Sequence, residues 1–473
     1  MSNLYTLLQT RFPEDGSHTF ATLRDGTIIS YAGVEEASAR YANMLVSLGV
    51  RPGDRVAIQA PKNIDMLMLY LGCLRTGAVF LPLNPAYTAG ELDYFMRDSQ
   101  PALFVCDPAQ VESIRALANA AGVGRVETLG DAGSGTLAAL AGKCAADFAT
   151  IDRADNDLAA ILYTSGTTGR SKGAMLSHGN LASNAFTLKD IWRFTSDDTL
   201  LHALPIFHTH GLFVATNVIL AAGASMIFLS AFDVEDVLDA LPRANTMMGV
   251  PTFYIRLLKE ERFTAEYVAH MRLFISGSAP LSADIHREFS GRTGHAILER
   301  YGMTETNMNT SNPYEGDRIA GTVGKPLPGV SIRIADPETG VVLPQGEIGV
   351  IEIAGPNVFQ GYWQMPEKTA EELRPDGWFI TGDLGRVDGD GYVQIVGRAK
   401  DLVITGGFNV YPIEVEMALD DQPGVLESAV IGLPHPDFGE AVFAVLVAKT
   451  GAVLEPATVL AGLKERLAKF KQP

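Results

Sequence analysis

The sequence has only three cysteines, no surplus of positive charge and no long uninterrupted hydrophobic run. Cys73, Cys106 and Cys144 are too few for a disulfide framework in a chain of this length, and no C-x-x-C pair indicates zinc. A formal net charge of −18 argues against sequence-independent binding to nucleic acid or to an anionic membrane. We therefore expect a cytoplasmic protein without stable membrane association, in which any anionic ligand is held by a local cationic pocket.

The sequence also shows neither a membrane-spanning segment nor an export signal. The most apolar segments are residues 65–83, which Arg75 interrupts, and residues 215–229, which are too short to cross a bilayer. The first residues lack a basic region followed by an apolar stretch, so we expect no signal peptide. With 473 residues, 47% of them hydrophobic, the chain can build sizeable cores, and more than one domain is expected.

Short apolar runs alternate with longer amphipathic stretches over the first two thirds of the chain. The predicted strands are 55–59, 79–83, 102–106, 159–163, 225–229, 246–250 and 272–275. The predicted helices include 35–48, 64–74, one from Pro251 through Lys259, and 283–290 with Ser282 as its N-cap. This alternation is typical of parallel, doubly wound sheets, whose ligands bind at the carboxyl ends of the strands.

From Gly321 onward, the alternation of predicted strands and helices gives way to short strands separated by turns. Strand-like pieces at 331–334 and 349–353 are separated by turn residues, and hairpin signals follow at 388–389 and 390–391, which predicts a β-rich module. After Asp401, a strand–loop–helix pattern opens a smaller α+β segment.

The segment YTSGTTGRSKG, Tyr163 to Gly173, follows a predicted buried strand. Its glycines allow backbone N–H groups to approach phosphate oxygens, its hydroxyls donate further bonds, and Arg170 and Lys172 neutralise charge. The Walker pattern does not fit, because Ser171 stands where its second glycine would be. Taken by itself, the segment fits either a polyphosphate loop of another kind or an ordinary surface turn.

Four further motifs change that balance. They are SGSAP (276–280), ERYGMTET (299–306), TGD (381–383) and GRAKD (397–401). Taken singly, each motif can be explained without a function, because its residues could be ordinary turn residues, core residues or solvated side chains. Together and in this order, they make the sequence resemble the adenylate-forming superfamily of acyl-CoA synthetases, luciferases and peptide-synthetase adenylation domains. Within it, the likeness is strongest to malonyl-CoA synthetases.

The resemblance implies an α/β fold with a large N-terminal domain of two doubly wound sheets plus a β-rich subdomain. That domain is expected to span residues 1–398, followed by a hinge at 399–401 and a small mobile α+β domain from residue 402 to 473. It also implies two half-reactions. A carboxylate and ATP form an acyl-adenylate and pyrophosphate, and coenzyme A then displaces AMP to give the thioester.

Site residues follow from the resemblance, position by position. The residues implied in ATP binding are Thr164, Ser165, Gly166, Thr167, Thr168, Gly169, Lys172, Ser278, Ala279, Pro280, Glu299, Arg300, Tyr301, Gly302, Met303, Thr304, Asp383 and Arg398. Those implied in catalysis are Thr164, Lys172, His208, Thr304 and Glu305, with Glu305 as the Mg²⁺ ligand. Lys400 occupies the hinge position, and Gly406 and Gly407 are expected to line the approach of coenzyme A.

The acid is expected to bind near PIFHTHGLF, residues 205–213, with His208, Arg256, Ser278, Gly302 and Met303 around it. His208 and His210 form an H-x-H pair that lacks a third metal ligand, so a pocket histidine is favoured over a metal site. Arg256 borders an apolar helical stripe and fits either an ordinary surface arginine or a cation for the second carboxylate of malonate. We expect malonate as the substrate, with methylmalonate tolerated.

The sequence departs from the superfamily pattern at KFKQP, residues 469–473. The resemblance implies more small domain and a Gly-Lys motif whose lysine serves adenylation, so we expect the small domain to be incomplete and adenylation impaired without that lysine. The alternatives are another short-chain or aryl acid–CoA ligase, or a degenerate member that binds nucleotide. A Walker-type NTPase would instead release the γ-phosphate.

Overall fold

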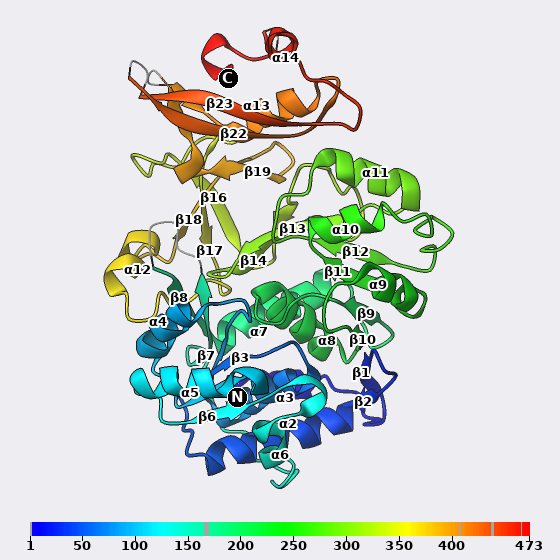
Figure 1. Ribbon diagram of the computed structural model, residues 1–473, viewed down its shortest axis with the longest axis vertical. Coiled ribbons are helices and arrows are strands. Elements are labelled where there is room, and N and C mark those ends of the chain that lie inside the picture. Colours follow the sequence, from blue (N-terminus) through cyan, green and yellow to red (C-terminus); the bar gives the residue numbers. More distant parts are fainter. Residues whose placement is uncertain (1, 165–169, 406–407, 437–438, 465) are drawn as a thin grey trace. The chain divides into compact units, whose positions relative to one another are not determined.

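The computed structural model describes residues 2–164, 170–405, 408–436, 439–464 and 466–473, and the chain divides into two compact units (Figure 1). The first unit comprises residues 1–331 and 354–377, and the second comprises residues 332–353 and 378–473. The β-rich module is thereby shared between the units. The boundary at residue 398 and the hinge at 399–401 stay predictions.

The strands form two sheets in the first unit. Across the nine-stranded sheet the order is β15 (Lys325–Pro326), β14 (Asn307–Ser311), β13 (Leu298–Met303), β12 (Leu273–Ser276), β11 (Thr246–Gly249), β9 (Thr199–His202), β10 (Ser225–Phe228), β1 (Thr19–Leu23) and β2 (Ile28–Ser30). Across the six-stranded sheet it is β6 (Val126–Thr128), β5 (Leu103–Cys106), β3 (Arg55–Gln59), β4 (Val79–Pro82), β7 (Leu158–Thr164) and β8 (Lys172–Ser177).

The second unit is built mainly on two four-stranded sheets. One has the order β16 (Ser331–Ala335), β17 (Gly349–Ala354), β18 (Phe379–Val387) and β19 (Val393–Arg398). The other has the order β21 (Phe408–Val410), β20 (Val403–Thr405), β23 (Gly439–Ala448) and β22 (Val425–His435). The predicted hairpin at 388–391 is the turn between β18 and β19, and the predicted strand–loop–helix after Asp401 is confirmed.

The α-helices are α1 (Leu4–Gln9), α2 (Tyr31–Ser47), α3 (Ile64–Thr76), α4 (Ala89–Ser99), α5 (Val111–Ala120), α6 (Thr136–Ala141), α7 (His178–Ile191), α8 (Asn217–Ala222), α9 (Val234–Ala240), α10 (Pro251–Leu257), α11 (Ala283–Thr293), α12 (Pro366–Glu372), α13 (Pro412–Asp420) and α14 (Pro456–Leu463). Short turns of helix are η1 (Pro108–Gln110), η2 (Asp131–Gly133), η4 (Leu241–Arg243), η5 (Ala399–Asp401) and η6 (Lys469–Lys471), and η3 (His210–Thr216) is a π-helix. As predicted, Pro251 opens α10, and the Ser282 hydroxyl caps α11 by accepting from Ile285 N.

The doubly wound α/β fold is confirmed, but the sheets are mixed. Their centres are parallel, as in β3 with β4 and β5, whereas β7 pairs antiparallel with β8, and β13 antiparallel with β14. The reason is chain length: residues 165–171 and 304–306 are too few for the crossover that a parallel pair needs. Both antiparallel hairpins carry residues of the predicted site.

Apolar side chains from strands and helices close the cores. In the nine-stranded sheet, Phe274 of β12 packs with Phe263 and with Phe289 of α11. In the six-stranded sheet, α4 and α5 cover a second cluster that includes Phe95 and Phe104. The three cysteines are free. Within the described ranges, no helix combines the length and hydropathy that a membrane crossing requires.

Candidate active site

The predicted phosphate loop joins the two strands of the β7–β8 hairpin. Thr164 ends β7, Lys172 begins β8, and the two residues are directly paired. The Thr164 hydroxyl lies 3.4 Å from the Lys172 carbonyl oxygen. The remaining loop predictions, Ser165, Gly166, Thr167, Thr168 and Gly169, lie outside the described residues.

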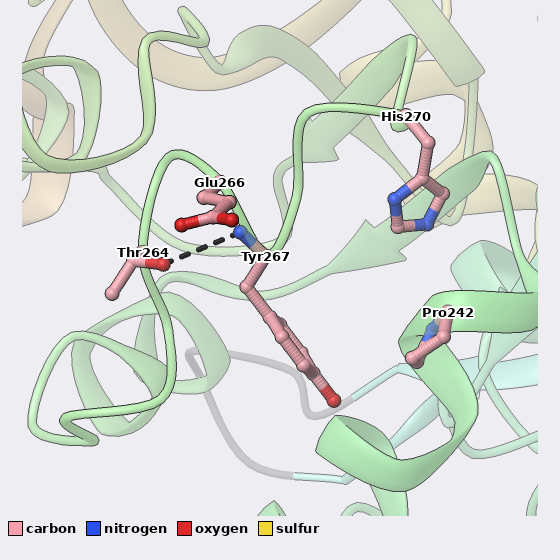
Figure 2. A pocket seen from close by; sticks show the side chains of 5 residues that line it. All are labelled: Pro242, Thr264, Glu266, Tyr267 and His270. Atoms are coloured by element: carbon pink, nitrogen blue, oxygen red, sulfur yellow. Dashed lines mark hydrogen bonds between the residues drawn. The ribbon is translucent and has the colours of Figure 1, made fainter.

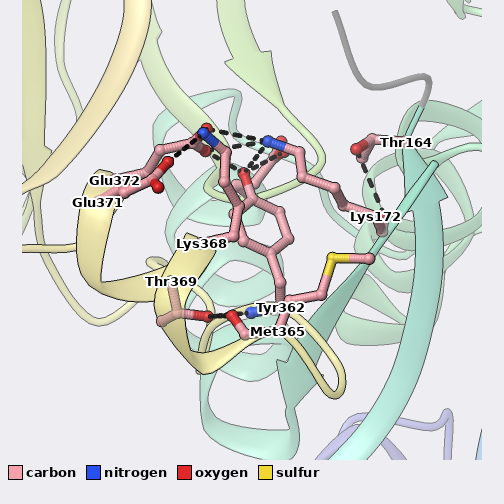
Figure 3. A network of polar contacts seen from close by, with 9 residues as sticks. Thr164, Lys172, Tyr362, Met365, Lys368, Thr369, Glu371 and Glu372 are labelled. Atoms are coloured by element: carbon pink, nitrogen blue, oxygen red, sulfur yellow. Dashed lines mark hydrogen bonds and ion pairs between the residues drawn. The ribbon is translucent and has the colours of Figure 1, made fainter. Parts of the chain in front are cut away.

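Lys172 is the centre of a polar network (Figure 3). Its ammonium lies 3.0 and 3.1 Å from the two carboxylate oxygens of Glu372 and 3.1 Å from the Tyr362 hydroxyl. Its Nζ also lies 4.2 Å from the centre of the Tyr362 ring. Both partners are distant in sequence, 190 and 200 residues beyond Lys172, so the network exists only in the folded protein.

Backbone pairing places Tyr362 at this position. Trp363 N donates to the Gly173 carbonyl at 2.7 Å, and Met175 N donates to the Gly361 carbonyl at 3.0 Å, so this segment runs along β8. Phe359 N donates to the Glu305 carbonyl at 2.8 Å. The same segment therefore links the phosphate-loop hairpin to the turn that carries Glu305.

Thr304 and Glu305 lie in the tight turn between β13 and β14. The Glu305 side chain is buried, and burial raises the pKa of this carboxyl above its usual range. The Tyr362 hydroxyl lies 2.9 Å from Glu305 Oε1 and 2.5 Å from Glu372 Oε2. A phenol has one hydrogen, so it donates to one of the two carboxylates at a time.

A second group of predicted residues follows β12. The motif 276–280 begins inside the strand with buried Ser276 and ends with exposed Ser278, Ala279 and Pro280. Ser278 has a φ of 71°, in the left-handed region that non-glycine residues rarely adopt. Such strain, worth about 1–3 kcal/mol, concentrates at functional sites.

Arg300 of β13 lies behind this motif and is 2% exposed. A Cβ on Gly277 would lie 2.5 Å from the guanidinium carbon of Arg300, so any larger residue there would displace the Arg300 side chain. Among the described residues, Nε and Nη2 of Arg300 have no hydrogen-bond partner. A buried guanidinium in this state favours an anionic ligand.

The Nδ1 atom of His210 lies 3.2 Å from the Ser278 hydroxyl. His210 is also near enough to Arg300 for the guanidinium charge to affect the pKa of its imidazole. Burial, and then the Arg300 charge, lower the pKa of His210 well below its usual value, so the ring is neutral at physiological pH. The sequence pattern singled out His208 of the H-x-H pair. His208 is exposed, and its ring lies tilted against the ring of Phe207, with ring centroids 4.5 Å apart.

Arg256, the predicted acid-binding cation, lies in α10 and is exposed. Its neighbours Tyr254 and Leu257 are buried, as the predicted apolar stripe requires. Arg256 as a substrate ligand stays a prediction, while the buried cation beside Ser278 is Arg300.

The remaining predicted residues of β13 run from Glu299, its second residue, to Met303 at its carboxyl end. Glu299 and Tyr301 are buried, and Gly302 and Met303 are partly exposed before the Thr304 turn. Glu299 Oε1 accepts from Leu281 N at 3.3 Å, and burial raises the pKa of Glu299 to about 7. This carboxyl thus supports the segment that follows the 276–280 motif.

In the second unit, Asp383 of β18 and Arg398 of β19 are directly paired across the two strands. Arg398 Nε lies 3.0 Å from Asp383 Oδ1, and the Asp383 side chain is 7% exposed. Asp383 N donates to the Thr381 hydroxyl at 3.0 Å. Lys400 is exposed in η5, and Gly406 and Gly407 lie outside the described residues.

Helix α4 anchors both arms of the phosphate-loop hairpin. The Tyr163 hydroxyl donates to Asp98 Oδ2, and the Tyr94 hydroxyl donates to the Ser171 carbonyl at 2.8 Å. Arg170 lies 5.7 Å from the centre of the Tyr94 ring. Neither these anchors nor Tyr362 and Glu372 belong to a local motif, because their contacts join residues far apart in the chain. For His210 only the H-x-H pair offered a signal.

A separate shallow pocket in the first unit contains none of the predicted site residues (Figure 2). Pro242, Thr264, Glu266, Tyr267 and His270 line it. The Tyr267 hydroxyl donates to the Leu238 carbonyl at 2.6 Å, and His270 Nε2 lies 3.0 Å from the Leu241 carbonyl. The described residues contain no cluster of three or more His, Cys, Asp or Glu that could hold a metal ion by itself.

Comparison with known proteins points to one family. The AMP-binding enzyme model matches residues 9–363, and the AMP-binding enzyme C-terminal domain model matches residues 414–473. The structure of ATP-bound MatB from Rhodopseudomonas palustris is 60% identical, with a TM-score of 0.97, covering 100% of this chain and 93% of that one.

Two curated relatives differ in the acid they are named for. A feruloyl-CoA synthase from an Amycolatopsis species is 39% identical, covering 96% of this chain and 91% of the relative. The malonate–CoA ligase of Arabidopsis thaliana is 35% identical, covering 90% of this chain and 74% of the relative.

Proposed function

The chain belongs to the family of AMP-binding enzymes, and we propose that this AMP-forming acyl-CoA ligase activates malonate, with methylmalonate as a second substrate. In the first half-reaction a malonate oxygen attacks the α-phosphorus of ATP, and the bond to the β-phosphate oxygen breaks to release pyrophosphate. In the second, the thiol of coenzyme A attacks the malonyl carbonyl, loses its proton and releases AMP.

The observation that carries the choice of acid is the buried Arg300 guanidinium beside Ser278 and His210. Malonate carries a second carboxylate that can pair with such a cation, whereas ferulate has no second carboxylate. A monocarboxylic acid in the same position would offer no acceptor to Nε and Nη2 of this buried cation, which disfavours its binding. The likeness to ATP-bound MatB and to the Arabidopsis malonate–CoA ligase supports the same choice.

Nucleotide binding is assigned to residues on both hairpins and in the second unit. Thr164 and Lys172 hold the β- and γ-phosphates, Thr304 contacts the α-phosphate, and the 278–280 segment with Tyr301 borders the adenine. Asp383, paired with Arg398, accepts from the ribose hydroxyls through its carboxylate oxygens. Lys400 acts at the hinge between the adenylating and thioester-forming arrangements.

Magnesium fits the Glu305 turn. Mg²⁺ is commonly held by one or two carboxylates together with substrate phosphates, so a single buried carboxylate is a sufficient protein contribution. When bound, the ion neutralises charge on the triphosphate. Glu305 would hold it, and the Tyr362 hydroxyl, 2.9 Å from Glu305 Oε1, orients that carboxylate.

The test is ATP–pyrophosphate exchange with a panel of malonate, methylmalonate, acetate, ferulate, benzoate and fatty acids. We expect malonate to give the highest kcat/KM, followed by methylmalonate. Higher activity with ferulate or a fatty acid would assign the chain to another acid. Release of phosphate instead of AMP and pyrophosphate would exclude the ligase reaction itself.

A further inference from the structure

Glu372 belongs to no motif, yet it is the principal partner of the phosphate-loop lysine. It ends α12, and its carboxylate approaches Lys172 Nζ with both oxygens, at 3.0 and 3.1 Å (Figure 3). The side chains are 16% exposed for Lys172 and 23% for Glu372, so the pair is shielded from solvent. An ion pair in such a setting is screened less than a surface pair.

The donors of Lys172 are fully used in this arrangement. An ammonium group has three N–H donors, and its three nearest acceptors are the two Glu372 oxygens and the Tyr362 hydroxyl. A phosphate oxygen is also an anionic acceptor, so it must compete with the Glu372 carboxylate for the same hydrogens. Binding of a polyphosphate to Lys172 therefore requires Glu372 to give up at least one contact.

Glu372 can do so without being left unpaired. Lys368, four residues earlier on α12, lies 3.0 Å from Glu372 Oε1. The single hydrogen of the Tyr362 hydroxyl is shared between Glu372 and Glu305, so Lys368 is the donor that remains with Glu372 when Lys172 binds phosphate.

On this basis we propose that Glu372 is a positioning residue that pairs with Lys172 and is exchanged for a phosphate oxygen when ATP binds. The inference rests on the proposed function of Lys172. It adds a competitor for Lys172 to the site: the Glu372 carboxylate positions the lysine ammonium and weakens the affinity for ATP.

The test is the Kd of Mg·ATP for the whole protein and for Glu372→Gln, measured by calorimetry. The amide keeps the shape and removes the charge, so we expect the variant to bind Mg·ATP roughly threefold to tenfold more tightly, as loss of one competing ion pair allows. Glu371→Gln is the matched control, because Glu371 pairs with Lys368 and is 64% exposed. Its Kd is expected to equal that of the wild type.

The increase in affinity for Mg·ATP must also depend on Lys172. In a Lys172→Met background, Glu372→Gln is expected to leave the Kd of Mg·ATP unchanged. Unchanged or weaker binding by Glu372→Gln with Lys172 present would overturn the exchange, and a fall in Tm without tighter binding would assign Glu372 a structural role. Failure of the wild-type protein to bind Mg·ATP would instead contradict the proposed function, so the two failures are distinguishable.

Discussion

At the scale of single residues, burial separates the two arginines that could bind the second carboxylate of malonate. Arg300 is 2% exposed and adjoins Ser278 and His210, whereas the exposed Arg256 keeps its hydration. A desolvated guanidinium discriminates strongly between an acid that pairs with it and an acid that does not, and a hydrated one discriminates weakly. Selectivity for a dicarboxylate is therefore argued from Arg300.

Replacing Arg300 by Met is expected to lower kcat/KM for malonate by about a hundredfold or more, because a buried pair is lost. The KM for ATP should change much less, and ATP–pyrophosphate exchange measures both. Arg256→Met is the matched comparison, with an expected effect of less than about threefold. If Arg256→Met lowers kcat/KM for malonate more than Arg300→Met does, Arg256 is the residue that binds the acid.

His178 makes the free energy of unfolding depend on pH. It is fully buried, its Nδ1 accepts from Leu4 N at 3.0 Å, and burial lowers its pKa from 6.5 to about 4. Between these values the unfolded chain binds more protons than the native protein, so stability falls as the pH decreases from 6.5 towards 4. The loss attributable to His178 reaches about 3 kcal/mol at the lower limit.

Urea unfolding at several pH values between 4 and 7.5 measures this term. His178→Gln keeps an acceptor for Leu4 N but does not titrate, so its unfolding free energy should fall less steeply below pH 6.5. At pH 7.5 the unfolding free energies of the two proteins should differ only by the strength of the hydrogen bond that Leu4 N donates to residue 178. Parallel curves for the two proteins would exclude His178 as the source.

At the scale of elements, the site depends on two antiparallel hairpins at sheet margins. The β7–β8 hairpin carries Thr164 and Lys172, and the β13–β14 turn carries Thr304 and Glu305. A hairpin brings its two strand ends together, so a short loop can present backbone and side-chain donors to one ligand. Helix α4 then fixes the first hairpin through Tyr94 and Asp98.

Tyr94→Phe tests this anchor. The ring stays in place while the 2.8 Å bond to the Ser171 carbonyl is lost, so we expect the KM for ATP to rise about threefold to tenfold, as one hydrogen bond is worth. The KM for malonate should stay the same, because Ser171 belongs to the phosphate-loop hairpin. Tyr87→Phe, whose ring packs on Phe95 in the same cluster, is the control. Equal changes in both variants would indicate altered packing of α4.

At the scale of the whole molecule, nucleotide binding is expected to stabilise the folded chain, and residues of each unit can be tested for a contribution. Lys172 and Glu305 belong to the first unit, and Asp383 and Arg398 to the second. A ligand that binds only the folded chain stabilises it by about 2.7 kcal/mol at a concentration one hundred times its Kd. Mg·ATP is therefore expected to raise the Tm.

Thermal unfolding with increasing Mg·ATP measures this effect. Lys172→Met and Asp383→Asn should each reduce the rise in Tm at a fixed ATP concentration, because each removes a proposed contact from a different unit. Arg115→Gln, at an exposed ion pair of α5, serves as a control with an unchanged rise. A full rise in Asp383→Asn would exclude the second unit from nucleotide binding in this assay.

The sequence by itself determined the fold class, the family and the nucleotide motifs. Strand and helix periods are local, and YTSGTTG, YGMTE, TGD and GRAKD are contiguous, so both can be identified in the chain without its fold. The tertiary structure decided which residues surround those motifs. Arg300 rather than Arg256 is the buried cation, His210 rather than His208 is the buried imidazole, and Glu372 pairs with Lys172. These depend on burial and on contacts between segments far apart in the chain, which no local pattern encodes.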